Sequence, residues 1–173
     1  MKLVLQRLAE YNDQAATAML NIIAAAPADL ASQDVGVYFK SIDGITEHMA
    51  WAIALWLQRY ASFGSYACLA GQAIISADLQ ALRATIKGDR AKTIALLRET
   101  GALLSRFVAE LPESEFERRV RYRSTNGQEL ERTLWHTIFQ VLNHGTHHRG
   151  EISAILDQHG IANDFNSFVS YVS

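Results

Sequence analysis

The chain has 173 residues, of which 49% are hydrophobic and 20% are charged, and its formal net charge is -2 at pH 7. This length suits one domain with a single core over residues 1–173, and the apolar content excludes a disordered polyelectrolyte. The near-neutral charge argues against binding to a phosphate backbone, so we expect no nucleic-acid partner.

The cysteine content and the N-terminal segment indicate the compartment. Cys68 is the single cysteine, so no intramolecular disulfide can form and a reducing compartment is favoured. Arg7, Glu10 and Asp13 interrupt the apolar start before a signal-peptide core or a membrane span of about 20 residues is reached. We therefore expect a cytoplasmic protein with no membrane partner.

Two long helices are predicted in the first third of the chain. Over about residues 3–26, apolar residues from Val4 onward recur at steps of three and four, and Pro27 follows as a stop. About residues 38–60 carry a second apolar stripe, which includes His48. We therefore expect His48 on a buried helix face.

The middle of the chain predicts a connector and a third helix. Residues 61–73 contain two glycines and two serines, which is typical of a connector. From about residue 74 to residue 110 the pattern is helical again, and Gly88 and Asp89 mark a break or a fresh start. This region holds the third long helix, with room for a shorter helix before it.

A small hairpin is predicted next. Residues 116–123 alternate between polar and apolar side chains, and Asn126 and Gly127 are typical of a type I′ turn. Residues 128–133 can return as the partner strand.

The last long helix is predicted from about residue 130 or 133 to residue 159, with Gly160 just beyond its end. Four principal helices predict an all-α fold: a four-helix up-and-down bundle with a small hairpin before the last helix. Aromatic residues of the C-terminal tail are expected to pack against it; they are Phe165, Phe168 and Tyr171.

Four of the six histidines fall within thirteen residues of the last predicted helix. His136 and His147 share a polar stripe, so they are expected to face solvent. His144 and His148 are four residues apart on a face that is otherwise apolar or small, so they point into the bundle. With a third imidazole from another helix, for which His48 is the natural candidate, they can supply three metal ligands and leave one position open.

Three neutral imidazoles suit Zn²⁺, and Ni²⁺, Co²⁺ and Fe²⁺ accept similar donors. At an open position a bound water becomes acidic and a bound thiol is held as thiolate, which gives such a site the makings of a catalyst. The alternative is that these histidines are hydrogen-bonded core residues, because a lone HxxxH in a helix is a weak motif.

Several sequence blocks resemble the DinB family of metalloenzymes, named for DNA-damage-inducible proteins. In chain order the blocks are Tyr11-Asn12, Tyr38-Phe39-Lys40-Ser41 before His48, Trp56-Leu57 after it, residues 122–127, Asn143-His144 and residues 146–150. The resemblance implies a four-helix bundle, commonly dimeric, whose histidine triad binds a divalent metal. Those ligands map onto His48, His144 and His148, with zinc or nickel as the metals we expect.

The resemblance also implies a reaction class. Members of the family include metal-dependent transferases and isomerases that use low-molecular-weight thiols, so we expect a thiol-dependent S-transferase or a hydrolase acting on a small-molecule electrophile. The alternative is a non-catalytic metal-binding or protein-interaction bundle in a stress or DNA-damage response. A homodimer is expected in either case.

Two residues near the histidines are candidates for catalytic roles. Arg149 fits two kinds of role equally: positioning an anionic substrate near the metal, or capping or pairing at the interface. Glu151 stands where the family usually has Gln, and it fits a carboxylate behind the ligands or a base. Its place on the polar stripe favours a third role, a solvated partner of His147.

Other residues have plainer interpretations. The densest basic patch could hold carboxylates of a thiol cofactor, but a solvated hairpin balanced by nearby acids is favoured; its arginines are Arg118, Arg119, Arg121 and Arg123, and the acids are Glu113, Glu115 and Glu117. The tryptophans are predicted as core or dimer-interface anchors; they are Trp51, Trp56 and Trp135. Cys68 is predicted to be a small buried apolar residue.

Overall fold

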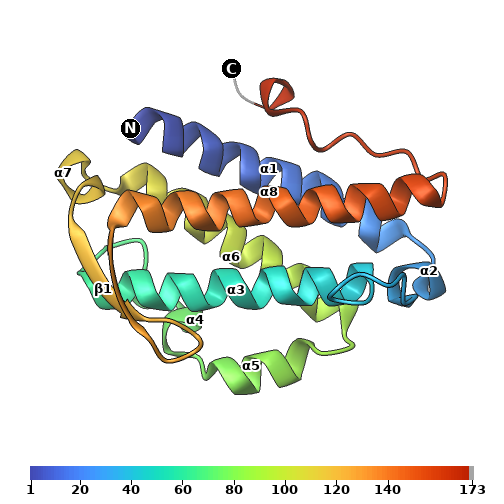
Figure 1. Ribbon diagram of the computed structural model, residues 1–173, viewed down its shortest axis with the longest axis horizontal. Coiled ribbons are helices and arrows are strands. Elements are labelled where there is room, and N and C mark those ends of the chain that lie inside the picture. The colour runs from blue at the N-terminus through green and yellow to red at the C-terminus, as the bar shows by residue number, and fades with distance from the viewer. Residues whose placement is uncertain (172–173) are drawn as a thin grey trace.

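The computed structural model describes residues 1–171, and four long helices form its body (Figure 1). Its elements in chain order are α1 (Lys2–Ala25), α2 (Ala28–Ser32), α3 (Ile42–Phe63), α4 (Ala73–Ser76), α5 (Leu79–Ile86), α6 (Arg90–Glu110), α7 (Glu113–Phe116), β1 (Arg119–Arg123), β2 (Glu129–Thr133), α8 (Leu134–Gln158) and a 3₁₀ helix (Phe168–Ser170). The predicted all-α bundle with a small hairpin before the last helix is confirmed.

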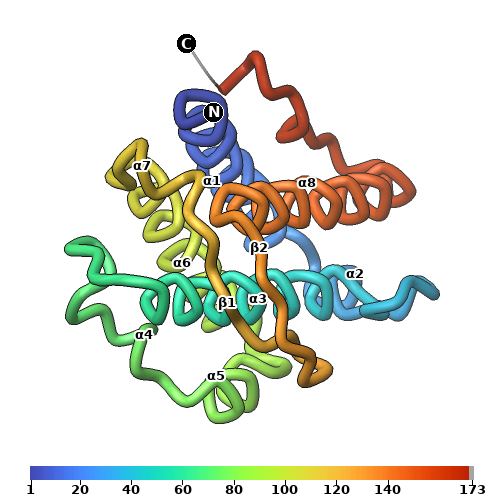
Figure 2. The backbone as a smooth tube through the Cα atoms, turned by 60° about the vertical axis from the view of Figure 1, so that its left-hand side comes forward, coloured from blue at the N-terminus to red at the C-terminus, as the bar shows by residue number. Residues whose placement is uncertain are grey.

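The path of the chain differs from simple alternation of helix directions. Asp43 near the start of α3 contacts Arg90 at the start of α6, and Tyr60 near the end of α3 stacks on Phe107 near the end of α6. These two helices therefore run in the same direction, while α1 and α8 run the opposite way (Figure 1). The physical reason is α5, which carries the chain back along the bundle before α6 begins (Figure 2).

The second helix begins later than its apolar stripe predicts. Residues 38–60 were expected, but α3 starts at Ile42, because the Ser41 hydroxyl accepts the N–H of Gly44 as an N-cap. Lys40, just before the cap, has a positive φ of 74°, which helical backbone does not allow. At its other end α3 extends to Phe63, into the predicted connector.

The break predicted within the third helical region is confirmed. Gly88 has a φ of 72°, which favours glycine, and separates α5 from α6. Asp89 then caps α6 by accepting the N–H of Lys92. Glu47 on α3 accepts the N–H of Gly88, so the turn is also fixed to the bundle.

The predicted hairpin is confirmed, but the predicted turn type is wrong. Strands β1 and β2 are antiparallel, with Arg123 opposite Glu129. Gly127 has a φ of 86°, and Asn126 before it does not have the positive φ that a type I′ turn requires. The loop closes further out, where the N–H of Ser124 donates to the carbonyl of Gln128, so it is longer than a two-residue turn.

The core lies between the four long helices and continues under the tail. Val4 was predicted on the buried stripe of α1, but it is 63% exposed. At the N-terminal end of α1 the buried face passes through its neighbour Leu5 instead. Phe165 of the tail is buried, and Phe168 packs edge-on against Tyr11 of α1. Residues 172 and 173 of the predicted single domain lie outside the described residues.

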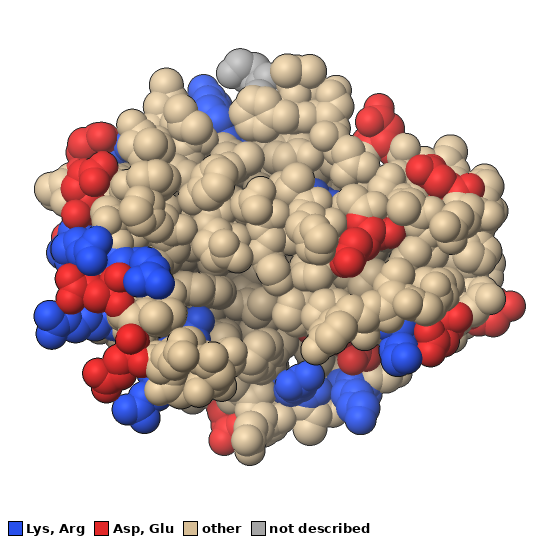
Figure 3. Space-filling model, in the orientation of Figure 1, with Lys and Arg blue, Asp and Glu red and all other residues tan. Residues whose placement is uncertain are grey.

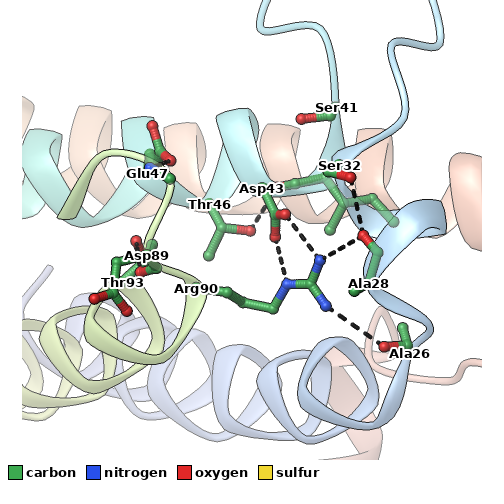
Figure 4. Close-up of polar contacts among 12 residues, drawn as sticks. Ala26, Ala28, Ser32, Ser41, Asp43, Thr46, Glu47, Asp89, Arg90 and Thr93 are labelled. Carbon is green, nitrogen blue, oxygen red and sulfur yellow. Dashed lines mark hydrogen bonds and ion pairs between the residues drawn. The ribbon is translucent and has the colours of Figure 1, made fainter.

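A charged cluster around Arg90 fixes the start of α6 to its neighbours (Figure 4). The Arg90 guanidinium donates to both carboxylate oxygens of Asp43, at 2.7 and 2.9 Å. It also donates to the carbonyls of Ala26, just after α1, and Ala28, the first residue of α2. This Arg90 cluster therefore joins three segments that are far apart in sequence.

Within residues 1–171, no helix combines the length and the apolar character that crossing a membrane requires.

Candidate metal centre

Three imidazoles meet between α3 and α8. The Nε2 atom of His144 lies 2.9 Å from Nε2 of His48 and 3.0 Å from Nε2 of His148. All three residues offer a ligand atom within 4.8 Å of the others, so they could hold a metal ion. The structure thus brings together the three histidines predicted as ligands, and we refer to them as the histidine cluster.

Helix periodicity and an aromatic side chain position these rings. His144 and His148 are one turn apart on α8, so their side chains project from one face toward α3. Phe39, in the turn before α3, stacks on the His48 ring with centroids 4.1 Å apart and meets His148 edge-on. Sequence reasoning did not single out Phe39, although it lies in one of the blocks that carry the family resemblance.

Glu151 lies directly behind one of the predicted ligands. Its Oε2 atom is 2.6 Å from Nδ1 of His148, whereas its Oε1 atom is 3.5 Å from Nε2 of His147. Glu151 therefore contacts both His147, the partner favoured from the sequence, and His148. One turn of helix brings Glu151 within reach of both histidines, and His147 and His136 are exposed as predicted.

The environment keeps two of the imidazoles neutral. Burial lowers the pKa of His48 and of His144 to about 4, and the neighbouring histidines add to this effect. Both rings are therefore uncharged at neutral pH and carry a lone pair. A neutral imidazole is the form that binds a metal.

The three Nε2 atoms of the histidine cluster cannot all be paired with one another as hydrogen-bond donor and acceptor. Glu151 accepts the Nδ1 proton of His148, which leaves Nε2 of that ring as an acceptor. Nε2 of His144 has two nitrogen neighbours and at most one proton to share between them. A cation that takes three lone pairs resolves this conflict.

The spacing also fits a cation. Two metal–nitrogen bonds of about 2.0–2.1 Å that meet at a right angle place their nitrogens about 2.9 Å apart, and tetrahedral bonds place them a few tenths of an ångström further. The separations of 2.9 and 3.0 Å in the cluster match the right-angle spacing and are shorter than the tetrahedral one by about 0.4 Å. The donor set and its spacing are therefore compatible with a divalent metal.

A cavity of about 290 Å³ opens beside His48 and His144. Trp51 and Trp56 of α3 line it together with Tyr122 of the hairpin. The two tryptophans therefore face this space and are partly buried, and Trp56 also packs against the core. Figure 3 shows that the face between α8 and α3 is hollowed and largely free of charged residues, which suits an organic ligand.

Arg149 does not reach this cavity. It is 1% exposed, and its guanidinium donates to the side-chain oxygens of Asn12, at 2.7 Å, and Thr146, at 3.0 Å. The ring of Tyr11 lies against it. This placement on the α1 side of α8 departs from both predicted roles, because the charge is neither beside the histidine cluster nor exposed for an interface.

The basic patch is a solvated hairpin whose charges are paired, as favoured from the sequence. Its ion pairs are Arg118 with Glu115, Arg119 and Arg121 with Glu131, and Arg123 with Glu129. Of the three acids predicted to balance the patch, Glu115 takes part. The other two partners, Glu129 and Glu131, lie on β2, where the antiparallel register brings them opposite arginines of β1. Cys68 is buried, and burial raises the pKa of its thiol.

Comparisons with known proteins identify the family of this chain. The model of the DinB family matches residues 1–171. The chain is 26% identical over 159 residues to Protein DinB of Bacillus subtilis (strain 168), covering 90% of this chain and 86% of that protein. No solved structure gives a significant match.

Proposed function

We propose that this chain, which belongs to the DinB family, is an enzyme that depends on a divalent metal held by His48, His144 and His148. The observation that carries the proposal is the convergence of three Nε2 atoms beside a cavity. Zinc and nickel are the metals proposed, since both accept imidazole donors.

The chemistry follows from the donors and the cavity. When bound, a divalent cation supplies Lewis acidity, which makes a coordinated water or thiol more acidic. Glu151 holds the proton on Nδ1 of His148 and so directs the lone pair of Nε2 into the cluster. Trp51 and Val141 form apolar parts of the cavity wall, which exclude water and hold the carbon skeleton of a substrate.

We propose that the reaction is attack of a low-molecular-weight thiol, or of water, on a small-molecule electrophile, as in an S-transferase or a hydrolase. The cavity volume suits a small organic substrate. The thiol is suggested by the family resemblance.

Metal content is the first test. The purified protein and the variants His48→Ala, His144→Ala and His148→Ala are analysed by plasma mass spectrometry, with His147→Ala as the matched control. His147 is exposed and lies on the same helix as two of the proposed ligands. We expect one metal per chain in the wild type and the control, and loss in the other three; a wild type that also fails to take up Zn²⁺ or Ni²⁺ would contradict the proposal.

Turnover is the second test. The metal-loaded protein is assayed with several thiols and electrophiles, beside His144→Ala. Metal-dependent turnover supports the enzyme proposal. Inactivity across the whole panel, with metal bound, points instead to a non-catalytic metal-binding or protein-interaction bundle.

We also propose a cytoplasmic homodimer. Exposed apolar side chains at one end of the bundle support association: Leu3 and Val4 on α1 are 66% and 63% exposed, and Phe139 on α8 is 46% exposed. Light scattering at micromolar concentration should give twice the chain mass of 19.3 kDa, and a monomeric mass would contradict the dimer.

A further inference from the structure

We propose that Arg59 binds the carboxylate of an elongated, mainly apolar ligand whose other end reaches the histidine cluster. This inference rests on the proposed function, because it takes the cavity beside His48 and His144 as the substrate site.

Arg59 and His48 line the same cavity from the same helix. They are eleven residues apart, which is about three turns, so they lie on one face of α3 and about 16 Å apart along its axis. A ligand that spans the cavity can therefore have one end at the histidines and the other at the guanidinium.

The Arg59 guanidinium is held in place by its neighbours. It lies 4.6 Å from the ring centre of Trp56 and 5.0 Å from that of Tyr122. One of its nitrogens, Nη2, donates to the carbonyl of Arg123 at 2.8 Å. Because arginine has five N–H donors, this arrangement orients the group and leaves donors for a ligand.

The charge of Arg59 is not matched by an acid. Each of the hairpin arginines 118, 119, 121 and 123 forms an ion pair with a glutamate. Among residues 1–171, Arg59 forms none, although it is half-buried and the neighbours that act on its charge are Tyr60 and Tyr122. A partly desolvated cation that is already oriented by aromatic rings favours a planar anion such as a carboxylate.

The middle of the cavity sets the rest of the ligand. Between the two ends the α3 wall is formed by Ala52 and Leu55, and Val141 and Leu130 face it from α8 and the hairpin. These side chains offer apolar contact and no charge. The ligand class is therefore a carboxylate joined through an apolar spacer to a group that binds metal.

Binding of ω-mercapto acids and of the corresponding mercapto alcohols tests the proposal. Mercaptoacetic, mercaptohexanoic and mercaptoundecanoic acids are compared with mercaptoethanol, mercaptohexanol and mercaptoundecanol by titration calorimetry and tryptophan fluorescence. Each titration is made with metal-loaded and with metal-free protein. The variants are Arg59→Gln, Arg59→Lys and the matched control Arg83→Gln, since Arg83 also lies over a tryptophan of α3, Trp51, but does not line the cavity.

We expect the wild type to prefer the longer acids over their alcohols, and Arg59→Gln to lose this preference by about tenfold to a hundredfold. Arg59→Lys should recover part of the preference, and Arg83→Gln should retain all of it. Equal affinities for acid and alcohol in the wild type, or an equal loss of both in Arg59→Gln, would overturn the proposal.

The metal-free titrations separate the two proposals. A protein that takes up no metal but still prefers acids through Arg59 contradicts the proposed function and supports this inference. A protein that binds metal normally in all variants, with no preference for acids, supports the proposed metal site and contradicts this inference.

Discussion

Two polar clusters share the first half of α3: the Arg90 cluster around Asp43 and the histidine cluster around His48. In the Arg90 cluster, the donors of one guanidinium meet two carboxylate oxygens and two carbonyls. In the histidine cluster, three Nε2 atoms face one another and Glu151 fixes one of them as an acceptor. The first has matched donors and acceptors, and the second has an excess of lone pairs.

This difference separates a structural role from a binding role. A buried cluster whose hydrogen bonds are complete stabilises the elements that it joins, and removing one member leaves an unmatched charge. A cluster with surplus lone pairs has its full stability only with a cation, so its loss should affect binding more than folding.

The largest effect is expected for metal binding in His144→Ala. The Nε2 atom of His144 lies within 3.0 Å of Nε2 of both other histidines, so its removal leaves only two of the three donors. We expect metal uptake to be lost, as measured by calorimetric titration with Zn²⁺ and Ni²⁺. Urea unfolding of the metal-free variant should differ little from that of the metal-free wild type, and a large loss of stability there would make the cluster structural.

The second effect is expected for stability in Asp43→Ala. The ion pair with Arg90 is about one-fifth exposed on each side, and its loss leaves the guanidinium without a counterion. Because the pair is partly buried, we expect the free energy of unfolding in urea to fall by about 1–3 kcal/mol, with unchanged metal affinity. Glu10→Ala is the control, because its pair with Arg7 is exposed and should contribute less than about 1 kcal/mol. Equal losses in both variants would remove the contrast between the clusters.

The third effect concerns Glu151→Ala. The change removes the acceptor of the Nδ1 proton of His148, so metal affinity should weaken by about tenfold to a hundredfold. His147→Ala tests the longer contact of the same carboxylate and should leave the affinity unchanged. The reverse result, with His147 dominant, would restore the solvated role that the polar stripe suggested.

Helix arithmetic predicted the part of the site that lies within one element. His144 and His148 were sorted from His136 and His147 because a period of 3.6 residues fixes which side chains share a face. The same arithmetic gave Glu151 one favoured partner, His147, whereas its long side chain reaches across the boundary between two faces and contacts His148 as well. Periodicity gives the direction of a Cα–Cβ bond and not the position of a carboxylate.

Contacts between elements distant in sequence could not be predicted in this way. Arg149 binds Asn12, which is 137 residues away, and no local pattern indicates that pair. The parallel course of α3 and α6 has the same origin, because it depends on the path of α5 and on the contact of Asp43 with Arg90. Such features depend on packing between whole helices, which the pattern within one helix does not specify.

The smallest effect is expected at two glycines of α8 and extends the comparison to Arg149. A Cβ at position 145 would lie 2.8 Å from Oδ1 of Asn12 and 3.4 Å from Nη1 of Arg149, so Gly145→Ala pushes apart the hydrogen-bonded pair. A Cβ at position 150 would have open space, and alanine is the better helix former there. We expect urea unfolding to show Gly145→Ala less stable by about 1 kcal/mol and Gly150→Ala more stable by about 0.5–1 kcal/mol.

Because Asn12 and Arg149 lie on the α1 side of α8, both variants should bind metal as the wild type does. If Gly145→Ala weakened metal binding, the Asn12–Arg149 contact on one side of α8 and the histidine cluster on the other side would be coupled.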